Sequence, residues 1–133
     1  MKTIVGTPNA PSSPFYSQAT KAGPFVFVSG MTGTDSATGQ LAGETIGEQT
    51  GQALANCLAI VEAAGGIRSD IAQVTVLLAR PEDFGGMNEA YAQFFSDEPP
   101  ARAVAKLGVD LPNVLVSIMM TAYVEGMTGI EPA

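Results

Sequence analysis

The stretch VLVSIMMTAYV, residues 114–124, decides the fold. Its β-branched and apolar residues favour a strand, and successive side chains of a strand point to opposite faces. One face then carries Leu115, Met119 and Tyr123. The other face carries apolar side chains at 114, 116, 118 and 120. Both faces need a cover: helices are expected over one, and a neighbouring copy of the chain is a candidate for the other.

Two helices are predicted upstream of this strand. The first begins at Thr45-Ile46-Gly47-Glu48, a capping box in which the Thr45 hydroxyl and the Glu48 carboxylate bond each other's backbone amides. It carries an apolar stripe and ends at Gly65-Gly66. The second opens at Pro81 with two acids in its first turn. Its inner face is predicted to carry Phe84, Met87, Asn88, Tyr91, Phe94 and Phe95.

Four further segments are predicted as strands. Residues 25–29, FVFVS, are expected to be buried on both faces, and the others are 2–5, 71–79 and 102–107. Residues 7–14 and 32–43 are rich in turn formers and read as loops. Because helices and strands do not alternate throughout, we predict an α+β domain with one sheet and both helices on one of its faces.

Composition points to one domain, over residues 1–125, followed by a loosely held tail at 126–133. A chain of 133 residues is typical of a single domain. Charged residues make up only 14% and hydrophobic residues 46%. A Gly/Ala-rich globule is one explanation, but so few charges favour the burial of part of the surface between subunits.

The charge balance argues against nucleic acid and against an anionic membrane as partners. The net charge is −7, and the six Lys and Arg residues are scattered without forming a patch. The first ten residues lack the apolar run of a signal peptide. No segment approaches the length of a membrane span. A cytoplasmic protein is therefore expected.

The chain has no histidine and one cysteine, Cys57. This removes the commonest general base and any metal site of the Cys/His type, so neither a metal nor a cofactor is expected. Cys57 lies at helical spacing from Leu54, Leu58 and Val61. It is therefore expected to be a small core residue.

Pro100-Ala101-Arg102 is the strongest candidate for a binding site. An arginine here enters a strand-like segment in an acidic protein. Its planar fork fits a carboxylate through two parallel hydrogen bonds. An ion pair with Asp97 or Glu98 is the structural alternative.

Taken in order, these segments resemble the RidA/YjgF family, also called the endoribonuclease L-PSP family. The resemblance runs from about residue 3 to 124. Its clearest motifs are Tyr16-Ser17-Gln18-Ala19, Phe27-Val28-Ser29-Gly30, Asn88-Glu89-Ala90-Tyr91 and Pro100-Ala101-Arg102. The resemblance implies a chorismate-mutase-like fold with a mixed sheet, and a homotrimer with a central β-barrel and clefts between subunits.

The resemblance also implies roles for individual residues. Arg102 would bind the carboxylate of a 2-imino or 2-enamino acid, facing Tyr16 of a neighbouring subunit. Gly30 would offer backbone contacts, and Asn88 would lie near the pocket. Water would then add to the imine carbon and ammonia would leave.

Three positions depart from the family pattern. Ser117 and Met119 stand where active deaminases carry the glutamates of a Val/Ile-Glu-Ile-Glu stretch, and Met31 replaces a frequent glutamine. Serine can bond a water but, without an activating base, cannot take its proton at neutral pH. Ser117 joins Arg102 and Tyr16 as a candidate catalytic residue, and Met31 and Met119 would line a more apolar pocket.

The function implied is a hydrolase or deaminase acting on a carboxylate-bearing enamine or imine. Because of Ser117, a non-catalytic trimer that binds small carboxylates such as 2-keto acids, or a pathway-specialised enzyme, is the alternative. Ribonuclease activity is the least favoured, because the chain is acidic.

Overall fold

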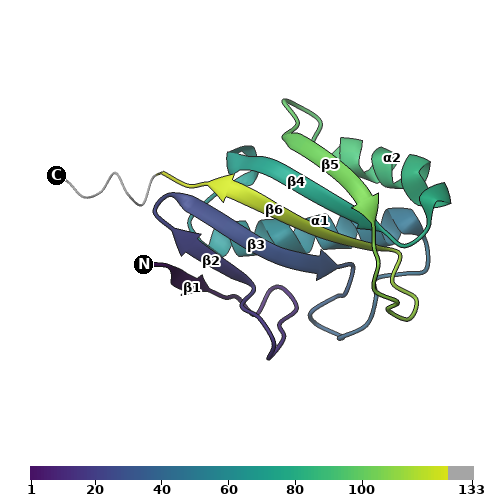
Figure 1. The fold of residues 1–133 in the computed structure, drawn as a ribbon, viewed down its shortest axis with the longest axis horizontal. Helices are drawn as coiled ribbons and strands as arrows, with labels where there is room; N and C mark the ends of the chain where they lie inside the picture. The colour runs from purple at the N-terminus through teal and green to yellow at the C-terminus, as the bar shows by residue number, and fades with distance from the viewer. Residues whose placement is uncertain (126–133) are drawn as a thin grey trace.

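The computed structural model describes residues 1–125, which form a six-stranded sheet covered on one face by two helices (Figure 1). The predicted tail at 126–133 lies outside the described residues. The strands are β1 (Thr3–Val5), β2 (Ala19–Ala22), β3 (Phe25–Thr32), β4 (Ile71–Leu78), β5 (Ala101–Lys106) and β6 (Val116–Tyr123). The helices are α1 (Ile46–Ala63) and α2 (Phe84–Phe94), with 3-10 turns at Arg68–Asp70 and Pro81–Asp83.

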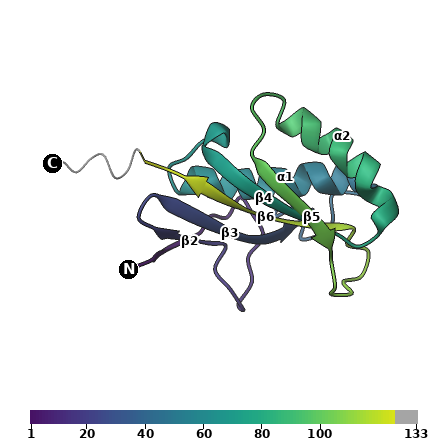
Figure 2. The same cartoon turned by 45° about the horizontal axis from the view of Figure 1, so that its top comes forward.

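The sheet is mixed, in the order β1-β2-β3-β6-β4-β5. Only β4 and β5 are parallel, because α2 carries the chain back between them, and the other neighbours are antiparallel. Helix α1 lies across β3 and β6, and α2 packs beside α1 on the same face (Figure 2). The predicted α+β class and the two helices on one face are confirmed.

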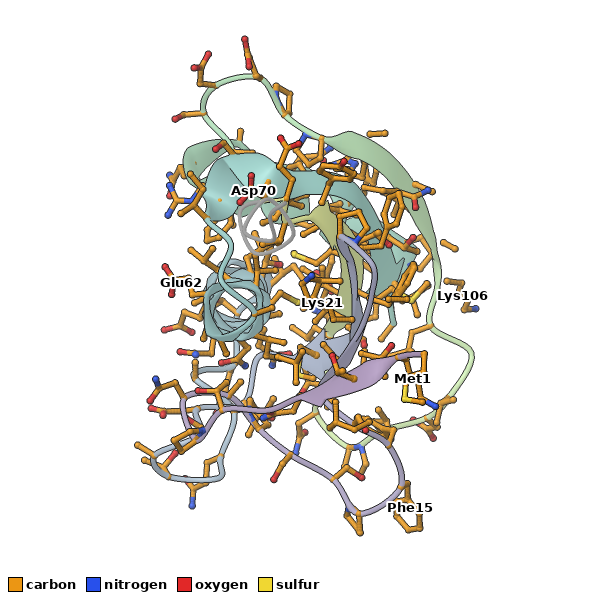
Figure 3. All side chains as sticks on the ribbon, turned by 90° about the vertical axis from the view of Figure 1, so that its left-hand side faces the viewer. Met1, Phe15, Lys21, Glu62, Asp70 and Lys106 are labelled. Atoms are coloured by element: carbon orange, nitrogen blue, oxygen red, sulfur yellow. The ribbon has the colours of Figure 1, made fainter. Side chains whose placement is uncertain are left out.

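Strand β6 has the predicted alternation. Val116, Ile118 and Met120 are at most 3% exposed beneath the helices, whereas Met119 and Tyr123 on the other face are 44% and 43% exposed. Figure 3 views the sheet from its end, with α1, marked by Glu62, on one side only. The uncovered side of the sheet, which carries Met119 and Tyr123, is called the open face below. It is the face for which the sequence indicates a neighbouring copy of the chain as a candidate cover.

The prediction that residues 25–29 are buried on both faces is wrong for the single chain. Val26 and Val28 are in the core, but Phe25 and Phe27 are 45% and 46% exposed on the open face. The Phe25 ring packs edge-on against Tyr123 at 5.4 Å between centroids. The apolar run therefore reflects one buried face and one that no helix of residues 1–125 covers.

Helix α1 begins and ends as predicted. The Glu48 amide donates to Thr45 Oγ1 at 3.1 Å, and the Thr45 amide donates to Glu48 Oε1 at 3.2 Å. Gly65, at φ 95°, provides the left-handed residue that follows the helix. Cys57 is fully buried, as expected, and burial raises the pKa of its thiol.

The start of helix α2 differs from the prediction. Residues Pro81–Asp83 form a 3-10 turn, held by an Arg80–Asp83 ion pair of 2.9 Å, so the α-helix begins only at Phe84. Phe84 is 46% exposed and lines a groove along β5 instead of the inner face. Met87, Tyr91 and Phe95 are buried as predicted.

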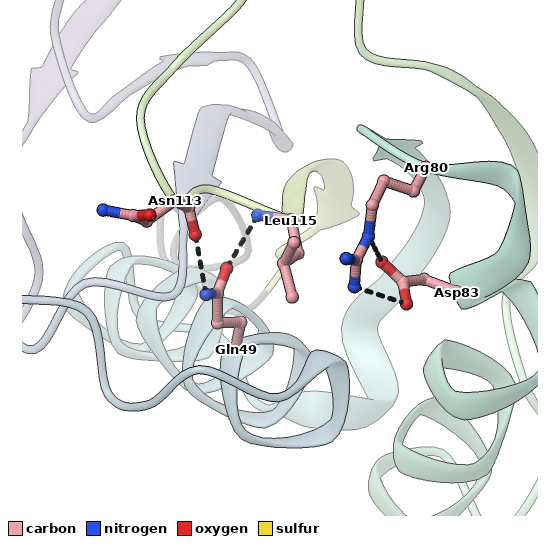
Figure 4. A network of polar contacts seen from close by, with 5 residues as sticks. All are labelled: Gln49, Arg80, Asp83, Asn113 and Leu115. Carbon is pink, nitrogen blue, oxygen red and sulfur yellow. Dashed lines mark hydrogen bonds and ion pairs between the residues drawn. The ribbon is translucent and has the colours of Figure 1, made fainter.

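Gln49 of α1 holds the loop that leads into β6 (Figure 4). Its Nε2 donates to the carbonyl of Asn113 at 3.0 Å, and its Oε1 accepts the amide of Leu115 at 2.8 Å. The side chain is only 1% exposed, so the Gln49 end of each bond is shielded from water. The strand that carries Ser117 is thereby tied to the helix behind it.

Candidate functional site

Arg102 lies on the edge strand β5 and points to the helix side of the sheet. Its backbone pairs with Val74, and its Nη1 donates to Asn88 Oδ1 of α2 at 2.7 Å. The guanidinium carbon lies 4.7 Å from the centroid of the Tyr91 ring, within the range of a cation–π contact. Asn88 and Tyr91 are three residues apart on one helix face, so α2 presents both to Arg102.

These side chains line a groove of about 470 Å³ at the edge of the sheet. Its walls are Asn88, Tyr91, Ala92, Phe95, Pro99, Pro100 and Arg102. Within residues 1–125, no carboxylate forms an ion pair with Arg102, so the alternative pairing with Asp97 or Glu98 is not made. A guanidinium has five N–H donors. Asn88 accepts a hydrogen bond from only one nitrogen of Arg102, Nη1, so most of the N–H donors of the guanidinium remain for a ligand.

Tyr91 forms the buried wall of this groove. Its side chain is only 6% exposed, and its hydroxyl has no hydrogen-bond partner among the described residues. Burial raises the pKa of Tyr91, and the charge of Arg102 partly opposes the rise. The sequence prediction treated Tyr91 as a helix-face residue. The Asn-x-x-Tyr spacing, which puts both side chains on one face, is the signal that could have placed it in the site.

Ser117 and Gly30 lie together on the neighbouring strands β6 and β3. A Cβ atom built on Gly30 would lie 3.0 Å from Ser117 Oγ, closer than ordinary van der Waals contact. Gly30 falls in the register shift between Val28 and Met31, and a glycine allows such a close approach. Ser117 faces the same side of β6 as Met119, which is on the open face.

Arg102 and Ser117 do not meet within one chain. Arg102 pairs with Val74, and Val74 pairs with Met120, which is three residues beyond Ser117 in β6. The Cα atoms of Arg102 and Ser117 are therefore separated by two strand spacings across the sheet and three residues along β6. That corresponds to roughly 14 Å. Arg102 points to the helix side and Ser117 to the open face.

Tyr16 lies in the loop that precedes β2, beyond the opposite half of the sheet from β5. It forms an isolated bridge with Ser13 and is 52% exposed. Figure 3 shows the neighbouring Phe15 at the tip of this loop. The side chain of Gln18 anchors the loop, donating to the carbonyl of Ala10 at 2.9 Å and accepting the amide of Thr7 at 2.7 Å.

Met31 differs from the other predicted site residues. It is 2% exposed and belongs to the hydrophobic core under the helices. The expectation that its side chain makes the pocket more apolar therefore does not hold for this structure. The bulge before it turns its side chain inward, opposite Ile118, and only its backbone remains for a ligand.

No metal site is evident in the part of the chain that the structure describes. Residues 1–125 contain no cluster of three or more Cys, His, Asp or Glu side chains that could hold a metal ion. Within the same residues, neither helix has both the length and the apolar character needed to cross a membrane.

Comparison with known proteins finds one family over nearly the whole chain. Residues 7–124 match the family described as endoribonuclease L-PSP. A RutC family protein of Pyrococcus horikoshii is 42% identical over 94% of this chain and 100% of its own length. The 2-iminobutanoate/2-iminopropanoate deaminase of Rattus norvegicus is 38% identical over 77% of this chain and 76% of its own.

The fold comparison agrees with the sequence comparison. The crystal structure of E. coli TdcF with bound serine superimposes with a TM-score of 0.85. It is 31% identical, and the match covers 91% of this chain and 98% of the other.

Proposed function

This chain belongs to the endoribonuclease L-PSP family, also known as RidA/YjgF, and from that membership we propose that it is a deaminase-type hydrolase. Its substrate is a small imine or enamine that carries a carboxylate. The rat relative is named for deamination of 2-iminobutanoate and 2-iminopropanoate, two acids of this kind. The bound serine of TdcF is likewise a small molecule with a carboxylate.

The observation that carries the proposal is the arrangement around Arg102. Its guanidinium is held by the neutral amide of Asn88 and the ring of Tyr91, with no carboxylate against it in residues 1–125. A positive charge that no internal acid neutralises, at the wall of a groove, suits a small anion. Pro99 and Pro100 form part of the wall of the same groove, whose volume of about 470 Å³ suits a small ligand.

The reaction we propose is addition of water to the C=N carbon. Water attacks C2 of the 2-imino acid, the nitrogen takes up protons, and ammonia leaves to give the 2-oxo acid. Arg102 holds the carboxylate and fixes the direction from which water approaches. Ser117 can hydrogen-bond that water but lacks a base to accept its proton, so this chain relies mainly on positioning.

A second copy of the chain is part of the proposal. Arg102, Ser117 and Tyr16 lie on different sides of one chain, and the open face exposes Phe25, Phe27, Met119 and Tyr123. Covering that face with neighbouring copies removes apolar surface from water. A homotrimer, with each ligand in a cleft between subunits, would satisfy both requirements.

The test follows the hydrolysis of imines that an amino-acid oxidase generates in the same cuvette. The wild-type protein should speed the loss of imine, and Arg102→Ala should abolish that effect. Arg68→Ala is the matched control, because Arg68 is also an exposed arginine stacked on an aromatic ring, Phe94, at 4.4 Å. No acceleration by the wild-type protein, over a range of side chains, would refute the proposal.

A specific observation favours a second function. Ser117 lies beside Gly30 where the family's deaminases carry an acid, so the chain can be a carboxylate-binding trimer without catalysis, or one adapted to another reaction. Binding of 2-oxo acids that depends on Arg102, without any hydrolysis of imines, would identify this case. RNA cleavage is disfavoured by the net charge of −7.

A further inference from the structure

Two buried hydroxyl groups within residues 1–125 make no hydrogen bond, and they differ in one respect. Thr50 Oγ1 and Tyr91 Oη are both shielded from solvent. Thr50 is fully buried in helix α1, whereas Tyr91 lines the groove that holds Arg102. A buried polar group without a partner costs free energy, so each calls for an explanation. Of the two residues, Tyr91 is the one that lines a groove where a ligand could supply the missing bond.

The position of Tyr91 relative to Arg102 defines what its hydroxyl can reach. The guanidinium lies 4.7 Å above the ring, and Asn88 holds it there from the preceding turn of α2. A carboxylate bound to Arg102 would therefore lie close to the same ring. The phenol oxygen belongs to that ring, and a bound acid a few atoms long must reach it for the hydroxyl to take part in binding.

The ring itself is fixed by its neighbours. It packs against Phe95 at 4.9 Å between centroids, and Phe95 packs against Phe94 at the same separation. A tyrosine so enclosed cannot swing away to find water elsewhere. Its hydroxyl is therefore preorganised, and a ligand that bonds it incurs little ordering cost.

We propose that Tyr91 is a specificity-determining residue whose hydroxyl hydrogen-bonds the polar atom on C2 of the acid that Arg102 holds. The site then selects acids with an oxygen or nitrogen at C2 over simple carboxylic acids of the same length. A site built around a polar group disfavours the analogue that lacks it, because the buried hydroxyl stays unpaired. This inference rests on the proposed role of Arg102 and adds the second point of recognition.

The experiment compares 2-oxobutanoate with butanoate, which differ only at C2, by titration calorimetry. The wild-type protein should bind 2-oxobutanoate about tenfold more tightly. Tyr91→Phe keeps the ring beneath Arg102 and removes only the hydroxyl, so it should bind the two acids with equal affinity. Thr50→Val is the matched control: it removes the other unpaired hydroxyl and should leave the preference intact.

The outcomes separate this inference from the proposed function. If Tyr91→Phe keeps the wild-type preference, or the wild-type protein shows none, while Arg102→Ala still abolishes binding, Tyr91 does not read C2 and only the anchor stands. If neither acid binds the wild-type protein, the carboxylate site itself is refuted. Thermal unfolding checks that Tyr91→Phe is folded, and removal of an unpaired hydroxyl is expected to keep its Tm at or above that of the wild type.

Discussion

Arg102 Nη1 and Asn88 Oδ1 are 2.7 Å apart, and this hydrogen bond joins the edge strand β5 to helix α2. The acceptor is a neutral amide, so the bond orients the guanidinium without cancelling its charge. The charge is therefore still able to attract an anion. An amide in place of an acid at position 88 leaves Arg102 without a structural ion pair there, which is what its proposed role as a binding group requires.

Asn88→Asp should therefore weaken the binding of small carboxylates at pH 7 by at least about tenfold. The new carboxylate would form a charge-assisted pair with Arg102 and compete with the ligand. Asn88→Ala removes the acceptor without adding charge and should cost only about threefold. Calorimetric titration with 2-oxobutanoate measures both. Equal losses in the two variants would mean that orientation, and not charge, is what Asn88 provides.

Ser117→Glu should increase the rate of imine hydrolysis. Ser117 lies on the open face of β6, so a longer side chain would extend away from the sheet. A carboxylate there could accept the proton of the attacking water, an effect worth about 100-fold in typical general-base catalysis. Ser117→Gln has the same size without the base and should show no gain. A similar rate in both variants would point to a pocket rebuilt for another ligand.

Gln18→Leu should lower the free energy of unfolding by about 3 kcal/mol, because it leaves the Thr7 amide and the Ala10 carbonyl without partners in a shielded site. Urea denaturation measures the change. Gln40→Leu, on an exposed loop, is the control and should change stability by less than about 0.5 kcal/mol. If the two variants proved equally stable, the hydrogen bonds of Gln18 to Thr7 and Ala10 would not be what holds the loop that carries Tyr16.

Alkaline pH should destabilise the protein in part through Cys57. Burial raises the pKa of its thiol in the folded state, and the thiol of the unfolded chain has a pKa of about 8.5. The unfolded state therefore loses the proton first, and stability falls as pH rises above about 8.5. One thiol contributes a slope of about 1.4 kcal/mol per pH unit.

Cys57→Ala isolates this contribution. Urea denaturation at pH 7.5 to 10 should show the alanine variant less stable at neutral pH but with a shallower decline. Parallel curves for the two proteins would show that the buried thiol titrates no differently in the folded and unfolded states.

The sequence predicted both ends of helix α1, because the residues that begin and end this helix act on their near neighbours in the chain. The capping box at Thr45 and the glycines at 65 and 66 bracket α1 because their bonds lie within a few residues of each other. Strand β2 is missing from the predicted strands, since ATKA has no apolar alternation. It forms because Gly23, at φ 58°, turns it back onto β3.

Positions that depend on distant partners could not be predicted in the same way. Phe25 and Phe27 look like core residues in sequence, and only the missing cover on the open face makes them exposed. Met31 looks accessible after Ser29-Gly30, but the bulge turns it inward. The spacing of Asn88 and Tyr91 puts both on one face of α2, but the position of Arg102 against that face depends on tertiary packing, which no spacing in the chain encodes.

The bonds from Gln49 to Asn113 and Leu115 have a consequence for strand pairing. Because β6 is apolar on both faces, sliding it by one position would exchange Met119 for Met120 and Leu115 for Val116 at little hydrophobic cost. Hydrophobic pattern alone thus leaves the alignment of this central strand weakly defined. Gln49 accepts and donates at two fixed backbone atoms just before the strand, and a slipped alignment would lose both bonds. One buried amide on a helix thereby selects which side chains, Ser117 among them, lie on the open face.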